Sequence, residues 1–131
     1  MRDFRKYQIW QDAITIANMV YSVTESFPKN EMYGLANQLQ RAAVSIGSNI
    51  AEGASRSSAV EYAHFLEIAI GSAFEVETQL AIATQRDYIP ISQHKELIIL
   101  LQKEEKQINT LIQKIRAISQ KPLGKEPMAN G

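Results

Sequence analysis

The chain has 131 residues, 45% of them hydrophobic and 21% charged, which is typical of one globular domain with a single core. Its 14 basic and 14 acidic residues balance, which argues against an avid nonspecific nucleic-acid binder, and the absence of cysteine excludes disulfides, thiolate metal sites and a cysteine nucleophile. There is no run near the ~20 apolar residues of a membrane span and no signal-peptide pattern, so we expect a cytoplasmic protein with no membrane partner.

Four segments repeat apolar residues at intervals of three and four, which is the period of an amphipathic α-helix. Their apolar stripes cover residues 9–27, 35–50, 62–83 and 97–118. Turn and breaker residues follow the first and third stripes, at Phe27-Pro28-Lys29-Asn30 and at residues 87–90. Asn30 is a candidate N-cap for the second helix, and residues 55–58 link the second helix to the third with further cap candidates.

Long helices of similar length joined by short links imply antiparallel neighbours. We therefore predict an all-α fold, an up-down-up-down antiparallel four-helix bundle, over residues 1–118. Residues 119–131 contain two prolines and two glycines and are expected to form a flexible C-terminal tail.

The second helix carries small polar residues on the side opposite its core. On an ideal helix they form one stripe: Arg41, Ser45, Ser48 and Glu52, flanked by Asn49 and Arg56. Serine, asparagine and glycine are mediocre or poor helix formers, so a merely solvated face gains nothing from them. A covering surface is the alternative to solvent: a neighbouring helix, another subunit or a ligand. Arg41 would then pair with Glu52 or with a carboxylate of a partner.

The third helix repeats this pattern with Glu67, Gly71 and Glu75 spaced four apart beside Ser72. Close packing of the second helix on the third is one interpretation, and an acidic pair facing the same site as Arg41 is the other. The predicted subunit or partner contact comprises Arg41, Ser45, Ser48, Asn49, Glu52, Arg56, Glu67 and Glu75.

Motifs for chemistry are sparse, and we assign no catalytic residue, metal ligand or cofactor. Glu61 and His64 form one E-x-x-H motif, whereas di-iron bundles require two. The other histidine, His94, has Ile91 where the second motif would need glutamate. There is no phosphate-binding loop and no nucleophile elbow, so we predict that the protein is not an enzyme.

Basic residues gather at two places that could contact nucleic acid. Arg5 and Lys6 lie among Phe4, Tyr7 and Trp10, which either stack on bases or close the end of the core. Near the C-terminus, residues 91–131 hold 7 basic and 4 acidic groups, either as a solvated face or as an RNA-facing patch. The possible nucleic-acid contacts are Arg5, Lys6, Lys114, Arg116 and Lys121.

Two polar residues lie close to core positions. Glu104 occupies a seam position of the fourth helix, and Asn49 lies near the seam of the second. Buried polar groups need partners, so we expect these two residues to be paired or to fix register or oligomeric state.

Four pieces of the sequence resemble one known family in the same order: I-W-Q-D-A, F-P-K-N-E-M-Y-G-L, Q-L-Q-R-A-A-V-S-I-G-S-N-I-A-E-G and F-L-E-I-A-I-G-S-A-F-E. The chain resembles the bacterial four-helix-bundle family once called ribosomal-protein-like, some members of which are encoded in intervening sequences of large-subunit ribosomal RNA genes. The resemblance implies a homopentamer without known enzymatic activity, and it matches Arg41, Ser45, Asn49, Glu52 and Glu75 to characteristic polar positions of the family.

Together these observations predict a non-enzymatic, self-associating bundle that acts as an assembly or interaction protein, with RNA or an RNA-associated protein as a further partner. The alternative is an RNA-binding module that uses the basic C-terminal helix and the N-terminal aromatic residues.

Overall fold

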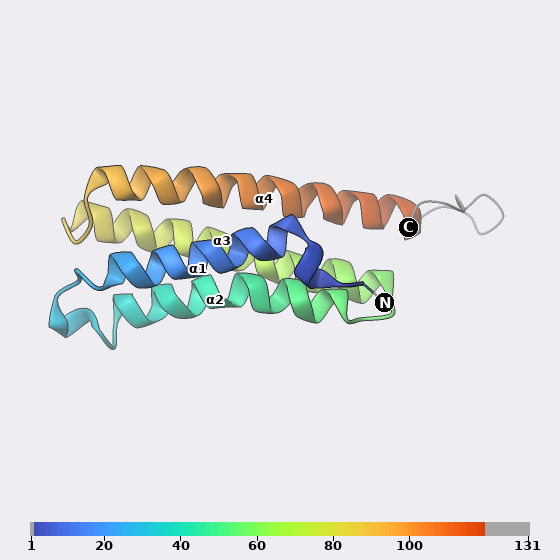
Figure 1. Cartoon of the computed structure of the whole chain (residues 1–131), viewed down its shortest axis with the longest axis horizontal. Coiled ribbons are helices and arrows are strands. Elements are labelled where there is room, and N and C mark those ends of the chain that lie inside the picture. Colours follow the sequence, from blue (N-terminus) through green and yellow to red (C-terminus); the bar gives the residue numbers. More distant parts are fainter. Residues whose placement is uncertain (1, 120–131) are drawn as a thin grey trace.

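The structure is a computed structural model that describes residues 2–119. It contains α1 (Gln8–Thr24), α2 (Leu35–Ala54), α3 (Ala59–Gln85) and α4 (Ile91–Ser119), with short 3-10 turns η1 (Phe4–Lys6) and η2 (Lys29–Glu31). The four long helices run antiparallel to their neighbours in one elongated bundle (Figure 1), which confirms the predicted fold class. The predicted tail lies outside the described residues, apart from Ser119.

The predicted seams form one continuous core. Each helix packs against its two neighbours in the ring α1–α2–α3–α4. The largest apolar side chains with almost no exposed surface come from all four helices: Ile16, Val20, Leu39, Ile46, Ile50, Leu66, Val76, Leu80, Leu97, Leu101 and Ile108. Full burial of each such side chain contributes about 1.5–3 kcal/mol. Among the described residues, no helix is both long and apolar enough to cross a membrane.

The helix boundaries differ from the predicted ones at the α1–α2 connection. The prediction that Asn30 caps α2 was wrong, because residues 29–31 form η2 and α2 starts only at Leu35. The Glu31 carboxylate accepts the Leu35 N–H at 3.2 Å and takes the capping role. α1 ends at Thr24, so Phe27 lies in the following loop and not in the helix, and its side chain is buried there.

The link between α2 and α3 behaves as predicted. Ser58 precedes α3 with an extended backbone, and its Oγ accepts the Glu61 N–H at 3.2 Å. This bond satisfies one of the unpaired N–H groups in the first turn of the helix.

Several small residues of α2 make close contacts with neighbouring helices. A Cβ atom on Gly53 would lie 2.9 Å from the Phe65 Cβ of α3, and one on Gly47 would lie 3.4 Å from the Ala13 Cβ of α1. Ser45 meets Ser72 of α3 through a hydroxyl–hydroxyl bond of 2.9 Å. Close helix packing therefore explains part of the small-residue pattern.

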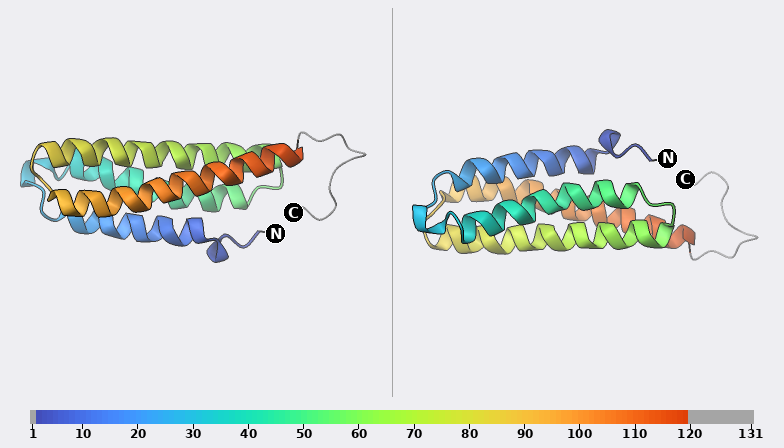
Figure 2. Two further views of the ribbon diagram at one scale, coloured as in Figure 1. Left: turned by 90° about the horizontal axis from the view of Figure 1, so that it is seen from above. Right: turned by 90° about the horizontal axis from the view of Figure 1, so that it is seen from below.

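The two ends of the bundle are built differently (Figure 2). One end carries the α1–α2 and α3–α4 connections, whereas the other carries the α2–α3 link and the start of the described chain. α1 has 17 residues and α4 has 29, so the C-terminal turns of α4 extend past the start of α1 (Figure 2).

Candidate interaction surfaces

The polar stripe of α2 divides into an inner and an outer part. Ser45 and Asn49 are half-buried, and the Asn49 amide donates to the Ser45 carbonyl at 2.8 Å and to its Oγ at 2.9 Å. Because Ser45 also receives the Ser72 hydroxyl, these two residues are engaged within the bundle. Arg41 and Ser48 are exposed on the outside of α2.

The charged residues of the predicted contact do not converge on one site. Glu52 pairs with Arg56 at 2.8 Å, so the expected pair between Arg41 and Glu52 does not form within the chain. Glu67 pairs with Arg116 of α4, also at 2.8 Å. The interpretation of a third-helix acidic pair facing Arg41 is therefore wrong, because Glu67 is directed to α4.

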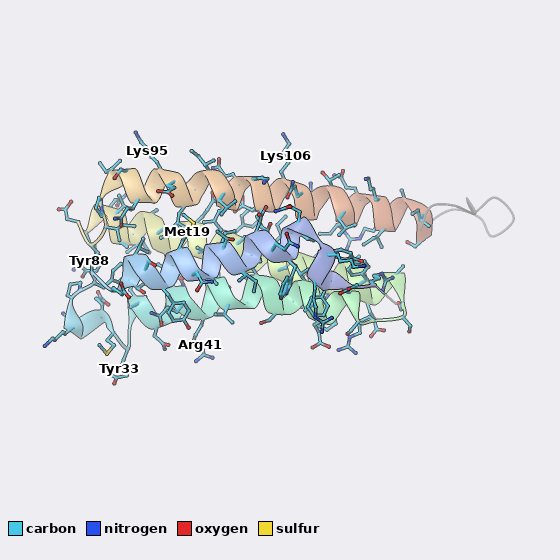
Figure 3. The ribbon with its side chains drawn as sticks, viewed as in Figure 1. Met19, Tyr33, Arg41, Tyr88, Lys95 and Lys106 are labelled. Carbon is cyan, nitrogen blue, oxygen red and sulfur yellow. The ribbon has the colours of Figure 1, made fainter. Side chains whose placement is uncertain are left out.

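Arg41 and Glu75 remain available for contacts outside the chain. Among residues 2–119, neither has an ion-pair partner, and both are exposed. The Arg41 side chain points away from the bundle (Figure 3). Of the predicted charged contact residues, these two are the ones that the bundle leaves unengaged.

Large apolar side chains are exposed beside Arg41. Ile14 and Tyr21 of α1 are 42% and 48% exposed, and Val44 of α2 is 45% exposed. A shallow hollow of about 440 Å³ lies between the two helices and is lined by Tyr21, Asn37, Gln40, Arg41, Val44, Ser45 and Ser48. We name the surface formed by Ile14, Tyr21, Arg41, Val44 and Ser48 the α1–α2 face.

The apolar members of this face could not be recognised from the stripe of α2 alone. Ile14, Tyr21 and Val44 fall between the seam positions of their helices. Each is a large apolar residue at a position that core packing does not require, and this pattern could have indicated them in the sequence. Exposed apolar residues that form a patch mark interaction sites.

The N-terminal aromatic residues pack against the end of the core, as one of the two interpretations predicted. Phe4, Tyr7 and Trp10 pack against the core cluster, and the Phe4 and Trp10 rings meet edge to face at 5.4 Å. The Arg2 guanidinium lies 4.2 Å from the Tyr62 ring centre and donates to the Arg56 carbonyl. These contacts leave the aromatic rings engaged with the protein.

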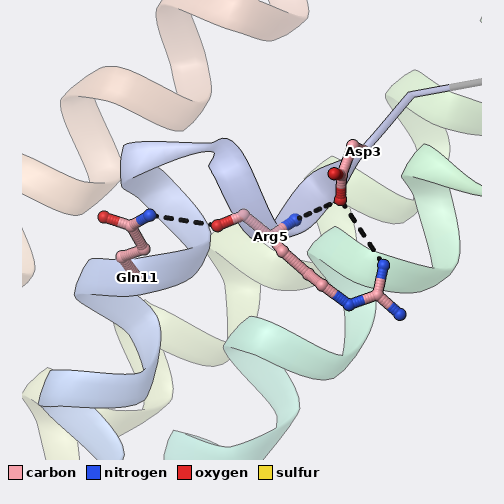
Figure 4. Close-up of polar contacts among 3 residues, drawn as sticks. All are labelled: Asp3, Arg5 and Gln11. Carbon is pink, nitrogen blue, oxygen red and sulfur yellow. Dashed lines mark hydrogen bonds and ion pairs between the residues drawn. The ribbon is translucent and has the colours of Figure 1, made fainter.

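The basic residues of this segment are only partly free. Arg5 Nη1 lies 3.4 Å from the Asp3 carboxylate, and the Gln11 amide donates to the Arg5 carbonyl at 3.0 Å (Figure 4). Lys6 is exposed. The pairing of Arg5 with Asp3 reduces the local positive charge that would attract a phosphate backbone.

The predicted basic residues at the C-terminal end of α4 are also separated by the structure. Arg116 is neutralised by Glu67, and Lys121 lies outside the described residues. Lys114 is exposed at the edge of a groove. Among the described residues, Lys114 has no ion-pair partner.

A groove of about 960 Å³ opens where α4 extends beyond α1; we name it the open-end groove. It is lined by Arg2, Tyr7, Gln8, Ile9, Ala59, Tyr62, Gln107, Leu111, Lys114, Ile115, Ala117 and Ile118. Burial and a contact with Tyr7 raise the pKa of Tyr62, so its hydroxyl stays neutral at physiological pH. Apolar side chains with a few polar groups at the margin are typical of binding sites.

Glu104 lies one turn before this groove and has no exposed surface. Neither carboxylate oxygen has a hydrogen-bond partner within the described residues. Burial, reinforced by the negative charge of Asp12, raises the pKa of Glu104 to about 8, against a smaller opposing effect of Lys103. The expectation that Glu104 is paired was therefore wrong for the described residues, and burial favours the neutral form of its carboxyl group.

Asp12 links this acidic site to the surface. Its Oδ1 accepts a hydrogen bond from the Gln8 amide at 2.8 Å. Its Oδ2 lies 3.3 Å from the Lys103 ammonium, within ion-pair range although not aligned as a hydrogen bond. The Asp12 carboxylate disfavours ionisation of Glu104 through its negative charge.

The histidines do not assemble a metal site. His64 is exposed and packs edge to face on Phe65 at 5.9 Å, whereas His94 lies at the other end of the bundle, on α4. Within residues 2–119, no three histidine, aspartate or glutamate side chains are placed to hold a metal ion.

Comparison with known proteins assigns the family. The 23S rRNA-intervening sequence protein family matches residues 5–110. The chain belongs to this family. No curated protein matches the sequence.

A solved structure supports the fold. The crystal structure of a protein of unknown function from the S23 ribosomal protein family of Bacteroides thetaiotaomicron superposes with a TM-score of 0.72 at 21% sequence identity. The match covers 79% of the present chain and 97% of the other. The chain therefore shares its fold with a protein of the S23 ribosomal protein family whose function is described as unknown.

Proposed function

We propose that this member of the intervening-sequence protein family is a non-enzymatic interaction protein that self-associates through the α1–α2 face. The observation that carries the proposal is that the exposed Tyr21 and Val44 line one hollow with the unpaired Arg41. Ile14 is exposed on the same helix as Tyr21, beside Gly47 of α2. Contiguous apolar surface of this kind on a soluble domain marks interaction sites.

The composition of the face fits a protein–protein contact. Tyrosine and arginine are the residue types that dominate binding energy in interfaces, and small polar residues such as Ser48 let a second backbone approach closely. Burial of the apolar side chains would contribute about 25 cal/mol for each Å² removed from water. Arg41 would supply an oriented, charge-assisted bond to a carboxylate of the neighbouring copy.

Glu75 is a suitable acceptor for that bond. It is exposed and has no ion-pair partner among residues 2–119, and it lies on α3, outside the α1–α2 face. A contact between different surfaces of two copies is heterologous, and such contacts form a ring where the rotation between successive copies closes. A homopentameric ring, the state that the family resemblance implies, is the assembly we propose.

An RNA or an RNA-associated protein is the proposed further partner, because the family is named for an intervening sequence of 23S ribosomal RNA. The alternative function, RNA binding by the basic C-terminal helix, relies on Lys114, Arg116 and Lys121. Replacing all three with glutamine should weaken RNA binding without changing the oligomer mass if that alternative holds, and binding should fall steeply with salt.

Sedimentation velocity on paired variants tests self-association. Val44→Glu places a charge in the centre of the α1–α2 face and should shift the protein towards the monomer. Ile99→Glu is the matched control, since Ile99 is 72% exposed on α4 and lies outside the proposed contact. Equal sedimentation of both variants and the wild type would remove the α1–α2 face as the interface.

A charge exchange tests the partner of Arg41. Arg41→Glu and Glu75→Arg should each weaken the oligomer, and the double variant should recover it because the opposite charges are restored. Additive weakening in the double variant would show that Arg41 and Glu75 do not meet.

A further inference from the structure

The apolar stripe of α4 is covered over most of its length and uncovered at its C-terminal end. Leu97, Leu101 and Ile108 have no exposed surface. Further along the same stripe, Leu111, Ile115 and Ile118 are only half-buried, although their spacing continues the pattern. The difference arises because α1 begins at Gln8 and does not reach the last turns of α4 (Figure 2).

The shape of the open-end groove follows from this missing helical segment. Residues 107–118 of α4 form one wall, the first turns of α1 and α3 form the others, and the volume is about 960 Å³. Elsewhere in the bundle, an α-helix packed by ridges and grooves fills the same space beside α4. Residues 107–118 span about 16 Å at 1.5 Å per residue, so the groove has room for about three helical turns.

The positive charge of the groove favours an acidic occupant. Among the described residues that line it, Arg2 and Lys114 are charged and none is acidic. Arg2 is fixed by the Tyr62 ring and by backbone carbonyls, so it keeps its position. A bound segment with carboxylates beside its apolar stripe would complement both cations.

We propose that the open-end groove binds an acidic amphipathic helix of a partner protein. Apolar residues of that helix, spaced at i, i+3 or i+4, and i+7, pack against Leu111, Ile115 and Ile118. Its flanking carboxylates face Lys114 and Arg2. This helix-in-groove binding is separate from self-association, which uses the α1–α2 face.

The chain's own C-terminal residues are a poorer match for the groove. Residues 120–131 contain Lys121, Lys125 and Glu126 as their charged residues and include two prolines. Their net positive charge opposes Arg2 and Lys114, and proline disfavours a continuous helix.

The experiment uses a designed probe and a single reporter. The chain has no cysteine, so Ala117→Cys, in the lining of the groove, accepts one environment-sensitive fluorophore. The probe is a synthetic amphipathic helix of about 15 residues with leucine at the stripe positions and glutamate on both flanks. A second peptide with lysine in place of glutamate is the matched control. We expect saturable binding of the glutamate peptide and at least about tenfold weaker binding of the lysine peptide.

Variants locate the binding. Lys114→Glu should weaken the glutamate peptide by about tenfold and reduce its salt dependence, and Ile115→Asp should weaken it by about 30-fold. Lys106→Glu is the charge control, because Lys106 points away from the bundle (Figure 3), and it should change affinity less than twofold. Val44→Glu should leave peptide binding intact, so failure of the self-association proposal would not affect this result.

Four outcomes would overturn the proposal. These are absence of saturable binding, equal affinity for the two peptides, equal weakening by Lys114→Glu and Lys106→Glu, and a large gain in affinity when the chain is ended at Ser119. The last result would show that residues 120–131 occupy the groove themselves.

Discussion

The two ends of the bundle differ in how the core is covered. At the end with two connections, each loop contributes one aromatic residue. The ring centres of these residues, Phe27 and Tyr88, lie 5.3 Å apart. The Tyr88 hydroxyl donates to the Glu31 carboxylate at 3.0 Å and accepts from Arg86 at 3.0 Å. At the other end, α1 begins at Gln8 and does not reach the last apolar turns of α4, which form one wall of the open-end groove.

This difference shows what determines closure in a four-helix bundle. The two loops at one end carry Phe27 and Tyr88, which seal the core. At the end with the single α2–α3 link, coverage of the core depends on helix length. Because α1 is shorter than α4 by twelve residues, 17 against 29, the deficit appears as surface that another molecule can use.

The largest predicted effect concerns Glu104, at the boundary between the covered and the open stretch of α4. Burial raises the pKa of its carboxyl group from the ordinary 4.5 to about 8, so between these pH values the folded state holds a proton that the unfolded state releases. The free energy of unfolding should therefore fall as pH rises through this window, by on the order of 4 kcal/mol. Urea unfolding at pH 5, 7 and 9 measures this slope.

Glu104→Gln should flatten that slope, whereas Glu96→Gln, at an exposed position of the same helix, should leave it unchanged. Burial and Glu77 raise the pKa of Glu105 to about 7. Glu105 therefore also lowers the free energy of unfolding as pH rises, and it does so equally in both variants. An unchanged slope in Glu104→Gln would mean that Glu104 is ionised and solvated in the folded protein.

The second prediction compares the two ends directly. Tyr88→Ala removes the ring contact with Phe27 and the bonds to Glu31 and Arg86, and it should lower the free energy of unfolding by about 3 kcal/mol. Ile118→Ala at the open-end groove should lower it by about 1 kcal/mol or less, since the side chain is half-exposed. Equal losses in chemical denaturation would contradict the closed-end and open-end distinction.

The third prediction tests whether α2 and α3 pack tightly at the end that carries the open-end groove. Gly53→Ala would place a Cβ 2.9 Å from the Phe65 Cβ and 3.2 Å from the Tyr62 carbonyl oxygen, and it should destabilise the fold by about 2 kcal/mol. Gly71→Ala meets nothing within 4 Å and should stabilise α3 by up to about 1 kcal/mol. Thermal melts of the two variants that shift in the same direction would disprove the tight α2–α3 contact.

The smallest predicted effect is that of the Glu52–Arg56 ion pair. The two side chains are four residues apart and largely solvated, at 50% and 39% exposure, so Glu52→Gln should lower stability by only about 0.3–0.5 kcal/mol. A change in oligomer mass, measured by light scattering, would instead assign Glu52 to the subunit contact.

The sequence predicted the helices and the core well, because periodic apolar residues specify which side of each helix is buried. It failed at the α1–α2 connection, where Glu31 caps α2 through a side-chain contact that residue preferences for caps did not favour over Asn30. Glu104 was found as a seam residue, but its lack of a partner depends on the three-dimensional environment of Asp12 and Lys103.

The candidate site was only partly predictable for a similar reason. The α2 stripe led to Arg41 and Ser48 on the surface, yet Ser45 and Asn49 turned out to be engaged with Ser72 and with each other. The open-end groove depends on the relative lengths of α1 and α4 and on how the N-terminal segment folds back. Such features need the assembled bundle and are not visible in the pattern of one helix.

The most direct test of the central claim, self-association, is the mass of the wild-type protein measured by size-exclusion chromatography with light scattering, recorded at 260 and 280 nm. Self-association predicts a discrete multiple of the 14.7 kDa chain, with excess absorbance at 260 nm if RNA accompanies it. A mass of 14.7 kDa at all concentrations would contradict self-association and leave the α1–α2 face as a site for a different partner.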